Sequence, residues 1–377
     1  MATRESKARK GGAGGKKGSS GPSSKSAQGG ANGRKKAGTP DRETLVGFYR
    51  TMFAARRTDD REIQLKRQNK IFFQISGAGH EAIQVAIAHH LRPGKDWFYL
   101  YYRDRALSQA LGMTPYEHLL QAVGAESDPA SGGRQMPSHW GHRDLRIVST
   151  SSPTGTQYLQ GVGTAEGAWR AGQLPDMAEV VESFEDDEVV LVTTGEGQTS
   201  EGEFWEALNT ATNLKLPVVF LVEDNGYAIS VPVEVNTPGG SISKIVSGFP
   251  GLYIEEVDGC DVLASLEAAG RAVDYCRRRK GPALLHAKVI RPYSHSMSDD
   301  ERLYRTEQER AADAERDPIQ RLRTHLIENE GVTEDELDAI DAEIKTAVQE
   351  ASDRAGEQPQ PEPETALDHL FSPDVDP

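Results

Sequence analysis

Cysteine is scarce in this chain, which has only Cys260 and Cys276 among its 377 residues. Two cysteines argue against a disulfide framework, and we interpret both as small apolar residues in a reducing interior. The sequence also lacks any apolar run of about 18 residues, the length that a membrane-spanning helix needs. No apolar stretch near the N-terminus is typical of a secretory signal. We therefore expect a cytoplasmic protein without a membrane partner.

Basic residues are in the minority, and the whole excess of acidic residues lies outside the N-terminal segment. The chain has a formal net charge of −15, yet residues 1–40 contain ten Lys or Arg and one acid, Glu5. This segment therefore carries +9 and the rest of the chain −24. An acidic body repels nucleic acid, so we expect no nucleic-acid partner. The Gly/Ser/Lys-rich segment has no aromatic residue and predicts a disordered, solubilising tail.

Helical patterns follow this tail. Thr39 and Pro40 predict the N-cap and the first position of a helix. A second helix is expected over residues 80–91. Residues 124–157 are rich in Gly, Ser and Pro and predict a long loop, a kind of segment that is often functional. The apolar face of the first helix is predicted to consist of Leu45, Phe48, Tyr49, Met52 and Phe53.

Three segments rich in β-branched and apolar residues, 188–194, 216–222 and 283–289, predict strands. Between the first two, residues 200–213 predict a helix that begins with a capping box, with Ser200 and Glu203 at its characteristic spacing. Strands that alternate with helices favour an α/β fold, in which a parallel sheet is flanked by helices.

The composition changes again toward the C-terminus. We expect the α/β domain to occupy residues 41–330. An acidic helical extension would follow over 331–357, and a Pro/Glu-rich tail or linker over 358–377.

The most informative segment is residues 188–230, which has the order strand, Gly-Glu-Gly turn, helix, strand. The carboxyl ends of parallel strands meet at one edge of a sheet, where ligands of α/β folds bind. Glu196 offers a carboxylate oxygen at this edge, Asn225 an amide oxygen and Tyr227 a backbone carbonyl. With two diphosphate oxygens and a water, these three oxygens would complete the octahedron that Mg²⁺ prefers.

The turn around Glu196 also suits a diphosphate. Gly195 and Gly197 let the backbone approach phosphate groups, and the helix that follows presents free N–H groups. A Gly-Glu-Gly turn alone is most often a plain loop, but 26 residues separate this one from Asp224 and Asn225. This spacing resembles the thiamine diphosphate motif, in which Gly-Asp-Gly is followed after a similar interval by Asn-Asn.

The sequence departs from that motif at two positions. Glu196 replaces the usual Asp, a substitution that also occurs in branched-chain α subunits. Asp224 replaces the first Asn, whereas the second Asn, the metal ligand in the family, is present as Asn225.

From about residue 42 to 325, the chain resembles the α subunits of the decarboxylating component of 2-oxo acid dehydrogenase complexes. Tyr102 and Arg103 match the Tyr-Arg pair that holds the cofactor's diphosphate, a role that suits the fixed fork of a guanidinium. Residues 134–141 resemble the branched-chain members more closely than the pyruvate dehydrogenases. Glu223 is typical of pyruvate-type members, whereas branched-chain members have Arg there. We expect its carboxylate to point away from the diphosphate.

The loop at 151–157 resembles a monovalent-cation loop of the branched-chain members, although Ser/Thr/Pro segments are usually plain turns. The resemblance implies that Ser152 and Thr154, like Gln198 of the Gly-Glu-Gly segment, contact the cofactor. It also implies that K⁺ is bound through Ser151, Pro153, Thr156 and Gln157.

Residues 291–305 resemble the loop that lines the active-site mouth in this family. The resemblance implies that Arg291 and His295 face the cofactor. His295 would bind near the diphosphate and assist acyl transfer to the lipoyl arm, which suits a side chain that exchanges protons near pH 7. Ser296 occupies a position that a dedicated kinase phosphorylates in animal enzymes, and we read it here as a serine that helps to order the loop.

The resemblance implies thiamine diphosphate, Mg²⁺ and K⁺ as cofactors and oxidative decarboxylation of a branched-chain 2-oxo acid. In the family, the glutamate that activates the cofactor lies on a β subunit, so we expect an α₂β₂ heterotetramer that passes the acyl group to a lipoyl domain. Residues 370–377 resemble the junction of fused α and β halves. The chain is thus either a separate α subunit or part of a longer polypeptide.

Several alternatives share part of this pattern. Pyruvate and acetoin dehydrogenase α subunits have most of the motifs, whereas a transketolase carries both cofactor-binding halves in a longer chain. A non-catalytic scaffold relative is disfavoured because all three predicted metal ligands are present. A Mg²⁺-dependent nucleotide-binding protein would need a Walker loop or a G-x-G-x-x-G turn, and the sequence contains neither.

Overall fold

The computed structural model describes residues 40–174 and 187–368. The predicted N-terminal tail, apart from its last residue, and the junction-like segment 370–377 lie outside the described residues. Among the helices of the described ranges, none is long and apolar enough to span a membrane.

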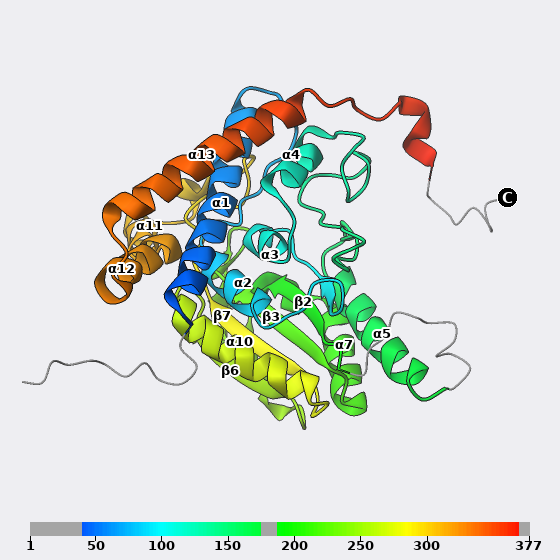
Figure 1. Cartoon of the computed structure of the whole chain (residues 1–377). Coiled ribbons are helices and arrows are strands. Elements are labelled where there is room, and N and C mark those ends of the chain that lie inside the picture. Colours follow the sequence, from blue (N-terminus) through cyan, green and yellow to red (C-terminus); the bar gives the residue numbers. More distant parts are fainter. Residues whose placement is uncertain (1–39, 175–186, 369–377) are drawn as a thin grey trace, which may run out of the picture. The chain divides into compact units, whose positions relative to one another are not determined.

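A five-stranded sheet runs through the described chain (Figure 1). Neighbouring strands all pair in parallel, in the order β1-β2-β3-β7-β6. Gly195 lies opposite Glu223 and Asp224 lies opposite Lys288, so the carboxyl ends of the three central strands meet at one edge. The strands are β1 (Trp97–Tyr99), β2 (Val190–Gly195), β3 (Val218–Asp224), β7 (Ala283–Lys288) and β6 (Tyr253–Asp258).

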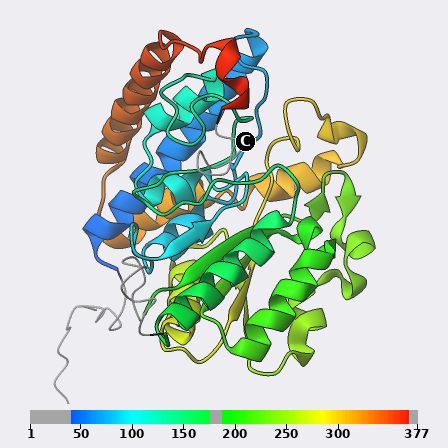
Figure 2. The ribbon, with the colours of Figure 1, turned by 90° about the vertical axis from the view of Figure 1, so that its right-hand side faces the viewer.

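Helices cover both faces of this sheet because successive residues of a strand point to opposite sides. The flanking helices are α2 (Glu81–Ala88), α5 (Thr156–Ala171), α7 (Gly202–Leu214) and α10 (Val262–Arg277). Helices α2 and α10 pack on the face that carries Leu191 and Val219. Helices α5 and α7 pack on the face that carries Val190 and Phe220 (Figure 2). The predicted α/β fold with a parallel sheet flanked by helices is confirmed.

The remaining longer helices are α1 (Arg42–Arg67), α3 (Arg105–Ala110), α4 (Pro115–Val123), α11 (Glu307–Ala314), α12 (Pro318–Glu330) and α13 (Glu334–Gly356). Helix α13 lies beside α1 in both views (Figures 1 and 2), and the Tyr49 hydroxyl of α1 donates to Asp341 of α13 at 2.8 Å. The predicted apolar face of α1 is largely confirmed, since four of its residues are buried and only Phe48 is partly exposed.

Short elements surround the carboxyl edge of the sheet and close several turns. Near the edge lie the 3-10 turn η1 (Glu196–Ser200), the two-stranded pair β4 (Tyr227–Ala228) and β5 (Val231–Pro232), and the helices α8 (Val233–Asn236) and α9 (Ile242–Ile245). Further 3-10 turns are η2 (Pro238–Gly240), η3 (Val246–Gly248), η4 (Glu301–Leu303) and η5 (Pro363–Leu367).

The first helix begins later than the sequence predicts. Its N-cap is Asp41, whose carboxylate accepts a hydrogen bond from the backbone N–H of Thr44 at 2.8 Å. Pro40 therefore precedes the cap instead of following it. Asp is as good an N-cap as Thr, and this carboxylate reaches a free N–H of the first turn.

The predicted capping box at Ser200 and Glu203 is also wrong. Ser200 ends η1, and helix α7 begins at Gly202 without a side-chain cap. The Ser200 hydroxyl instead donates to the Asn236 side chain at 3.3 Å. The chain leaves β2 through a 3-10 turn, and this turn takes up the residues that the pattern assigned to the first turn of α7.

Gly79, just before α2, tests how tightly this helix packs on the sheet. It has φ +91°, and an added Cβ would lie 2.2 Å from the carbonyl oxygen of Ile290. We expect Gly79→Ala to lower the free energy of unfolding, measured in urea, by about 3 kcal/mol or more. The control is Gly251→Ala, with φ +78° and no atom within 4 Å of the added Cβ. It should lose only about 1–2 kcal/mol for its left-handed backbone. Equal losses would contradict the close packing.

Candidate functional site

A cavity of about 280 Å³ opens at the carboxyl ends of β2 and β3. It brings together nine of the residues predicted for the site from distant parts of the sequence. They are Tyr102, Arg103, Thr154, Gly195, Glu196, Gly197, Gln198, Tyr227 and His295. A larger hollow of about 640 Å³ lies between α1 and the loop at 292–302, but none of the predicted cofactor or metal ligands line it.

Two glycines shape the floor of this cavity. A Cβ on Gly195 would lie 2.8 Å from the Tyr101 hydroxyl, and one on Gly197 would lie 2.6 Å from the Cβ of Ala228. Neither position therefore has room for a side chain. Their predicted role toward a phosphate stays a prediction, but the close approach of the surrounding chain explains why both residues are glycine.

Glu196 has an unsatisfied carboxyl oxygen inside the protein. Its side chain is 2% exposed, and its Oε1 has no hydrogen-bond partner among the described residues. Burial, reinforced by the negative charge of Asp224, raises the pKa of this carboxyl to about 7. A buried oxygen without a partner is costly, and a bound cation would remove that cost.

The neighbouring oxygens suit a hard cation. The Asn225 side-chain oxygen follows β3 and accepts from the backbone N–H of Tyr227 at 3.2 Å. In the described ranges 40–174 and 187–368, no three Cys, His, Asp or Glu side chains converge to hold a metal ion. A cation at Glu196 would therefore draw on neutral oxygens and on its ligand, as Mg²⁺ does when it binds with a phosphate.

Arg103 connects the cavity to two other segments of the chain. Its side chain is 1% exposed. Nη1 donates to the carbonyl of Ser76 at 2.6 Å, and Nη2 donates to the carbonyl and to Nδ1 of His295 at 3.1 and 3.0 Å. Because a guanidinium only donates, Nδ1 of His295 is the acceptor, and the ring proton of the neutral imidazole lies on Nε2.

His295 is held in its neutral form. Burial, together with the positive charges of Arg103 and Arg291, lowers the pKa of its imidazole to about 4. Its backbone N–H donates to Asp299 at 2.9 Å, and its ring meets the Tyr102 ring edge to face with centroids 6.2 Å apart. At neutral pH, His295 can therefore donate a hydrogen bond through Nε2.

Residues 49–364 match the family described as Dehydrogenase E1 component. The chain belongs to this family.

Similarity to individual members extends over most of the chain. It is 38% identical to the 2-oxoisovalerate dehydrogenase subunit alpha of Bacillus subtilis (strain 168), over 89% of this chain and 97% of the relative. It is 32% identical to the pyruvate dehydrogenase E1 component subunit alpha of Zymomonas mobilis, over 88% and 89% of the two chains. It is 30% identical to the mitochondrial 2-oxoisovalerate dehydrogenase subunit alpha of Homo sapiens, over 88% and 71%.

In this E1 chain, some of the predicted site residues do not line the cavity. The Ser152 hydroxyl is hydrogen-bonded to Nε2 of His139 at 2.8 Å. Arg291 donates to the carbonyl of Ile229 at 2.9 Å and to the Tyr304 hydroxyl at 2.7 Å, and so supports the loop that carries His295. Asn225 is buried beside the cavity without lining it.

Two of the predicted K⁺ ligands form hydrogen bonds within the protein, one inside the loop and one to the neighbouring strand and turn. The Thr156 hydroxyl donates to the carbonyl of Pro153 at 2.8 Å. The side-chain amide of Gln157 donates to the carbonyl of Thr193 at 3.3 Å and to Gln198 at 3.2 Å. Ser151 is partly exposed. The K⁺ site stays a prediction.

Glu223 lies where the sequence analysis expects it, away from the cavity. Its carboxylate is fully buried, hydrogen-bonded to Nδ1 of His80, and accepts from the Gln84 side chain at 3.0 Å. Burial raises the pKa of this carboxyl to about 7. Glu223 belongs to a polar layer beneath the cavity and is not one of its lining residues.

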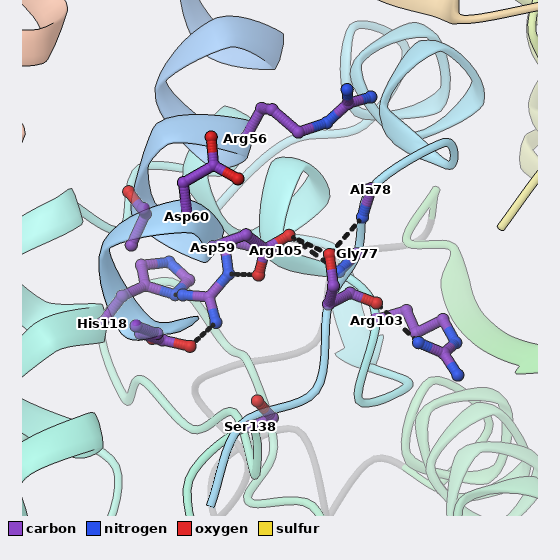
Figure 3. A network of polar contacts seen from close by, with 12 residues as sticks. Arg56, Asp59, Asp60, Gly77, Ala78, Arg103, Arg105, His118 and Ser138 are labelled. Atoms are coloured by element: carbon purple, nitrogen blue, oxygen red, sulfur yellow. Dashed lines mark hydrogen bonds and ion pairs between the residues drawn. The ribbon is translucent and has the colours of Figure 1, made fainter. Parts of the chain in front are cut away.

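A buried network that the sequence analysis missed supports Arg103 (Figure 3). Asp59 of α1 accepts from the Ser76 hydroxyl at 2.8 Å, from the Gly77 N–H at 2.9 Å and from Arg105 Nε at 2.9 Å. The carbonyl of Ser76 in turn accepts from Arg103. The position of Asp59 among the core-facing residues of α1 could have indicated this network, because charged residues are almost never buried unless they are paired.

The low pKa of His295 predicts a dependence of stability on pH. An unfolded His titrates near pH 6.5, whereas folded His295 titrates near pH 4. Between these values only the unfolded state binds the proton, so stability falls as the pH decreases from 6.5 toward 4. We expect His295→Asn, which keeps an acceptor near the position of Nδ1, to lose less stability than the parent between pH 7 and pH 5. Urea unfolding at both pH values measures this.

The matched control is His89→Asn at a solvent-exposed position. This variant should keep the pH dependence of the parent. A parent and a His295→Asn variant with identical pH dependence would contradict the neutral, buried state of His295.

Proposed function

We propose that this chain is the α subunit of a 2-oxo acid dehydrogenase that, together with a β subunit, oxidatively decarboxylates a branched-chain 2-oxo acid. The acyl group would pass to the lipoyl domain of an acyltransferase. The observation that carries this proposal is the unpartnered carboxylate oxygen of Glu196, in a cavity that Arg103 also lines, within a chain of the E1 family. The similarity to 2-oxoisovalerate dehydrogenase subunits supports the substrate class.

Membership of the E1 family implies dependence on thiamine diphosphate. When bound, this cofactor supplies the electron sink for decarboxylation. On this chain, Glu196, Asn225 and the carbonyl of Tyr227 would hold Mg²⁺ against the diphosphate. The residues that would contact the cofactor itself are Tyr102, Arg103, Ser152, Thr154, Gly195, Gly197, Gln198, Arg291 and His295. A K⁺ ion in the loop at 151–157 is part of the same proposal.

The chain's own residues prepare the site for an anionic ligand and for acyl transfer. Arg103 and Arg291 place two positive charges near His295, and their interaction with its imidazole is part of what keeps it neutral. A neutral imidazole with its proton on Nε2 can donate a hydrogen bond and later accept a proton. His295 lines the cavity, so it is the residue that we assign to acyl transfer.

In this proposal, a β subunit packs against the exposed residues at the mouth of the cavity. Ile229 lines it and is 57% exposed, and Val231 beside it is 40% exposed. Exposed apolar residues next to a binding cavity are typical of an interface. We propose that a β subunit covers this region in an α₂β₂ heterotetramer in the cytoplasm and supplies the carboxylate that activates the cofactor.

Glu196→Gln tests the metal ligand. The amide keeps the volume of the side chain but removes the charge that attracts Mg²⁺, so we expect Mg²⁺-dependent binding of thiamine diphosphate to weaken by about a hundredfold or more. Calorimetric titration in the presence of the β subunit measures it. Glu203→Gln, on the exposed side of α7, is the control and should bind as the parent does. Unchanged affinity in Glu196→Gln would rule out the metal assignment.

Turnover of competing substrates tests the reaction. With the β subunit, thiamine diphosphate, Mg²⁺ and a lipoyl domain present, we expect kcat/KM for 3-methyl-2-oxobutanoate to exceed that for pyruvate by about tenfold or more, since each apolar carbon that fits a pocket adds to binding. A preference for pyruvate would favour the alternative assignment as a pyruvate or acetoin dehydrogenase α subunit. Glu223 is a residue that pyruvate-type members have at this position. Tight cofactor binding without turnover of either acid would favour a non-catalytic scaffold.

A further inference from the structure

Asp224 is a buried carboxylate directly before the proposed metal ligand Asn225. It ends β3, and its side chain is 1% exposed. Oδ1 accepts from the backbone N–H of Gly226 at 2.9 Å. Oδ2 lies 2.8 Å from Nε2 of His286 and also accepts from the Lys288 ammonium. The Gly226 N–H and the Lys288 ammonium donate to this carboxylate, and the His286 ring lies within hydrogen-bond distance, an arrangement that keeps such a group ionised inside a protein.

The turn itself does not require this charge. The thiamine diphosphate motif that the segment resembles has Asn at this position, and an amide oxygen could also accept from Gly226. The contact to Lys288 on β7 is different, because an ammonium group can only donate. Lys288 is the strand partner of Asp224, and the buried His286 is two residues before it on the same strand. The residues around Asp224 are therefore matched to a carboxylate and not to an amide.

A second carboxylate lies close to the first. Glu196 follows β2 and Asp224 ends β3, the adjacent parallel strand, and the charge of Asp224 acts on Glu196. Glu196 is buried, lines the cavity and has an oxygen without a hydrogen-bond partner in the ranges 40–174 and 187–368. When both of these buried carboxylates are ionised they repel each other, and a divalent cation between Glu196 and the cavity would relieve that repulsion.

We propose that Asp224 is a positioning residue that adds a fixed negative charge behind the metal site, so that a divalent cation binds this chain before the diphosphate arrives. The inference rests on the proposed metal site at Glu196. A neutral Asn at position 224 would leave one charge at the site, and the cation would then depend on the phosphates for the rest. Lys288, which is partly exposed, offsets part of the Asp224 charge and limits the effect.

The test uses Mn²⁺ as a paramagnetic probe for the divalent cation. The full-length chain with its β subunit is titrated with Mn²⁺ without thiamine diphosphate, and free Mn²⁺ is measured by electron paramagnetic resonance. We expect the parent to bind Mn²⁺ and Asp224→Asn to bind it about tenfold more weakly. Lys288→Met should have the opposite effect and tighten Mn²⁺ binding severalfold, because it leaves the Asp224 charge less compensated.

Matched controls change the same charges away from the site. Lys280→Met precedes the opposite end of β7, and Asp274→Asn lies on the exposed side of α10. Both should bind Mn²⁺ as the parent does. If the two controls moved Mn²⁺ affinity as much as Asp224→Asn and Lys288→Met, net charge alone would explain the result and the proposal would fall.

The remaining outcomes separate this inference from the proposed function. Equal Mn²⁺ affinity in the parent and Asp224→Asn would overturn the role of Asp224, as would equal weakening in Asp224→Asn and Lys288→Met, which would indicate a packing effect. Binding of Mn²⁺ by the parent only after thiamine diphosphate is added would overturn the order of binding and leave the metal site intact. No Mn²⁺ binding even with thiamine diphosphate would remove the metal site itself.

Discussion

The parallel pairing of β2 with β3 is the constraint on which the site depends. Its register sets Gly195 opposite Glu223, so the residues that follow each strand, Glu196 and Asn225, emerge at the same edge. A shift by one residue would turn every side chain of a strand to the other face of the sheet. The register is held by two separate apolar layers, one on each face, since the alternate residues of both strands are buried against different helices.

Beneath the cavity, the protein contains more charge than a core usually tolerates. Arg103, Asp104, Glu196, Glu223 and His80 are all buried, and four of them have an atom without a hydrogen-bond partner in the part of the chain that the structure describes. Removing such groups from water is costly, and apolar residues of the same volume would pack there at less cost. Shifted pKa values in a cleft are typical of functional sites, and here the groups concerned surround the predicted ligands. These buried groups therefore lower the stability of the fold at this edge of the sheet, and we attribute their presence to ligand binding.

The sequence predicted the parts of the structure that follow local rules. The three predicted strands lie within two residues of their expected limits, and the Gly-Glu-Gly turn lies at the sheet edge as the strand order requires. The two edge strands β1 and β6 were not predicted. The errors lie where two local signals compete. Asp41 caps the first helix in place of Thr39, and η1 takes up Ser200. The network around Asp59 was out of reach, because its partners at 76, 77 and 105 come together only when the chain is folded. Whether the loop at 151–157 binds K⁺ depends on the ion itself, so neither the sequence pattern nor the packing of the chain decides the question.

Arg103 uses its donors in an uneven way. Both terminal nitrogens hold backbone carbonyls of the protein, at Ser76 and His295, while Nε is buried without a partner among the described residues. A guanidinium has five N–H donors, and these hydrogen bonds use three of them, one on Nη1 and two on Nη2. Both N–H groups of Nη2 are bonded to His295, so an anion that drew Nη2 away would also remove these two restraints on the histidine. Ligand binding at Arg103 and the mobility of the His295 side chain would thus be coupled through one guanidinium.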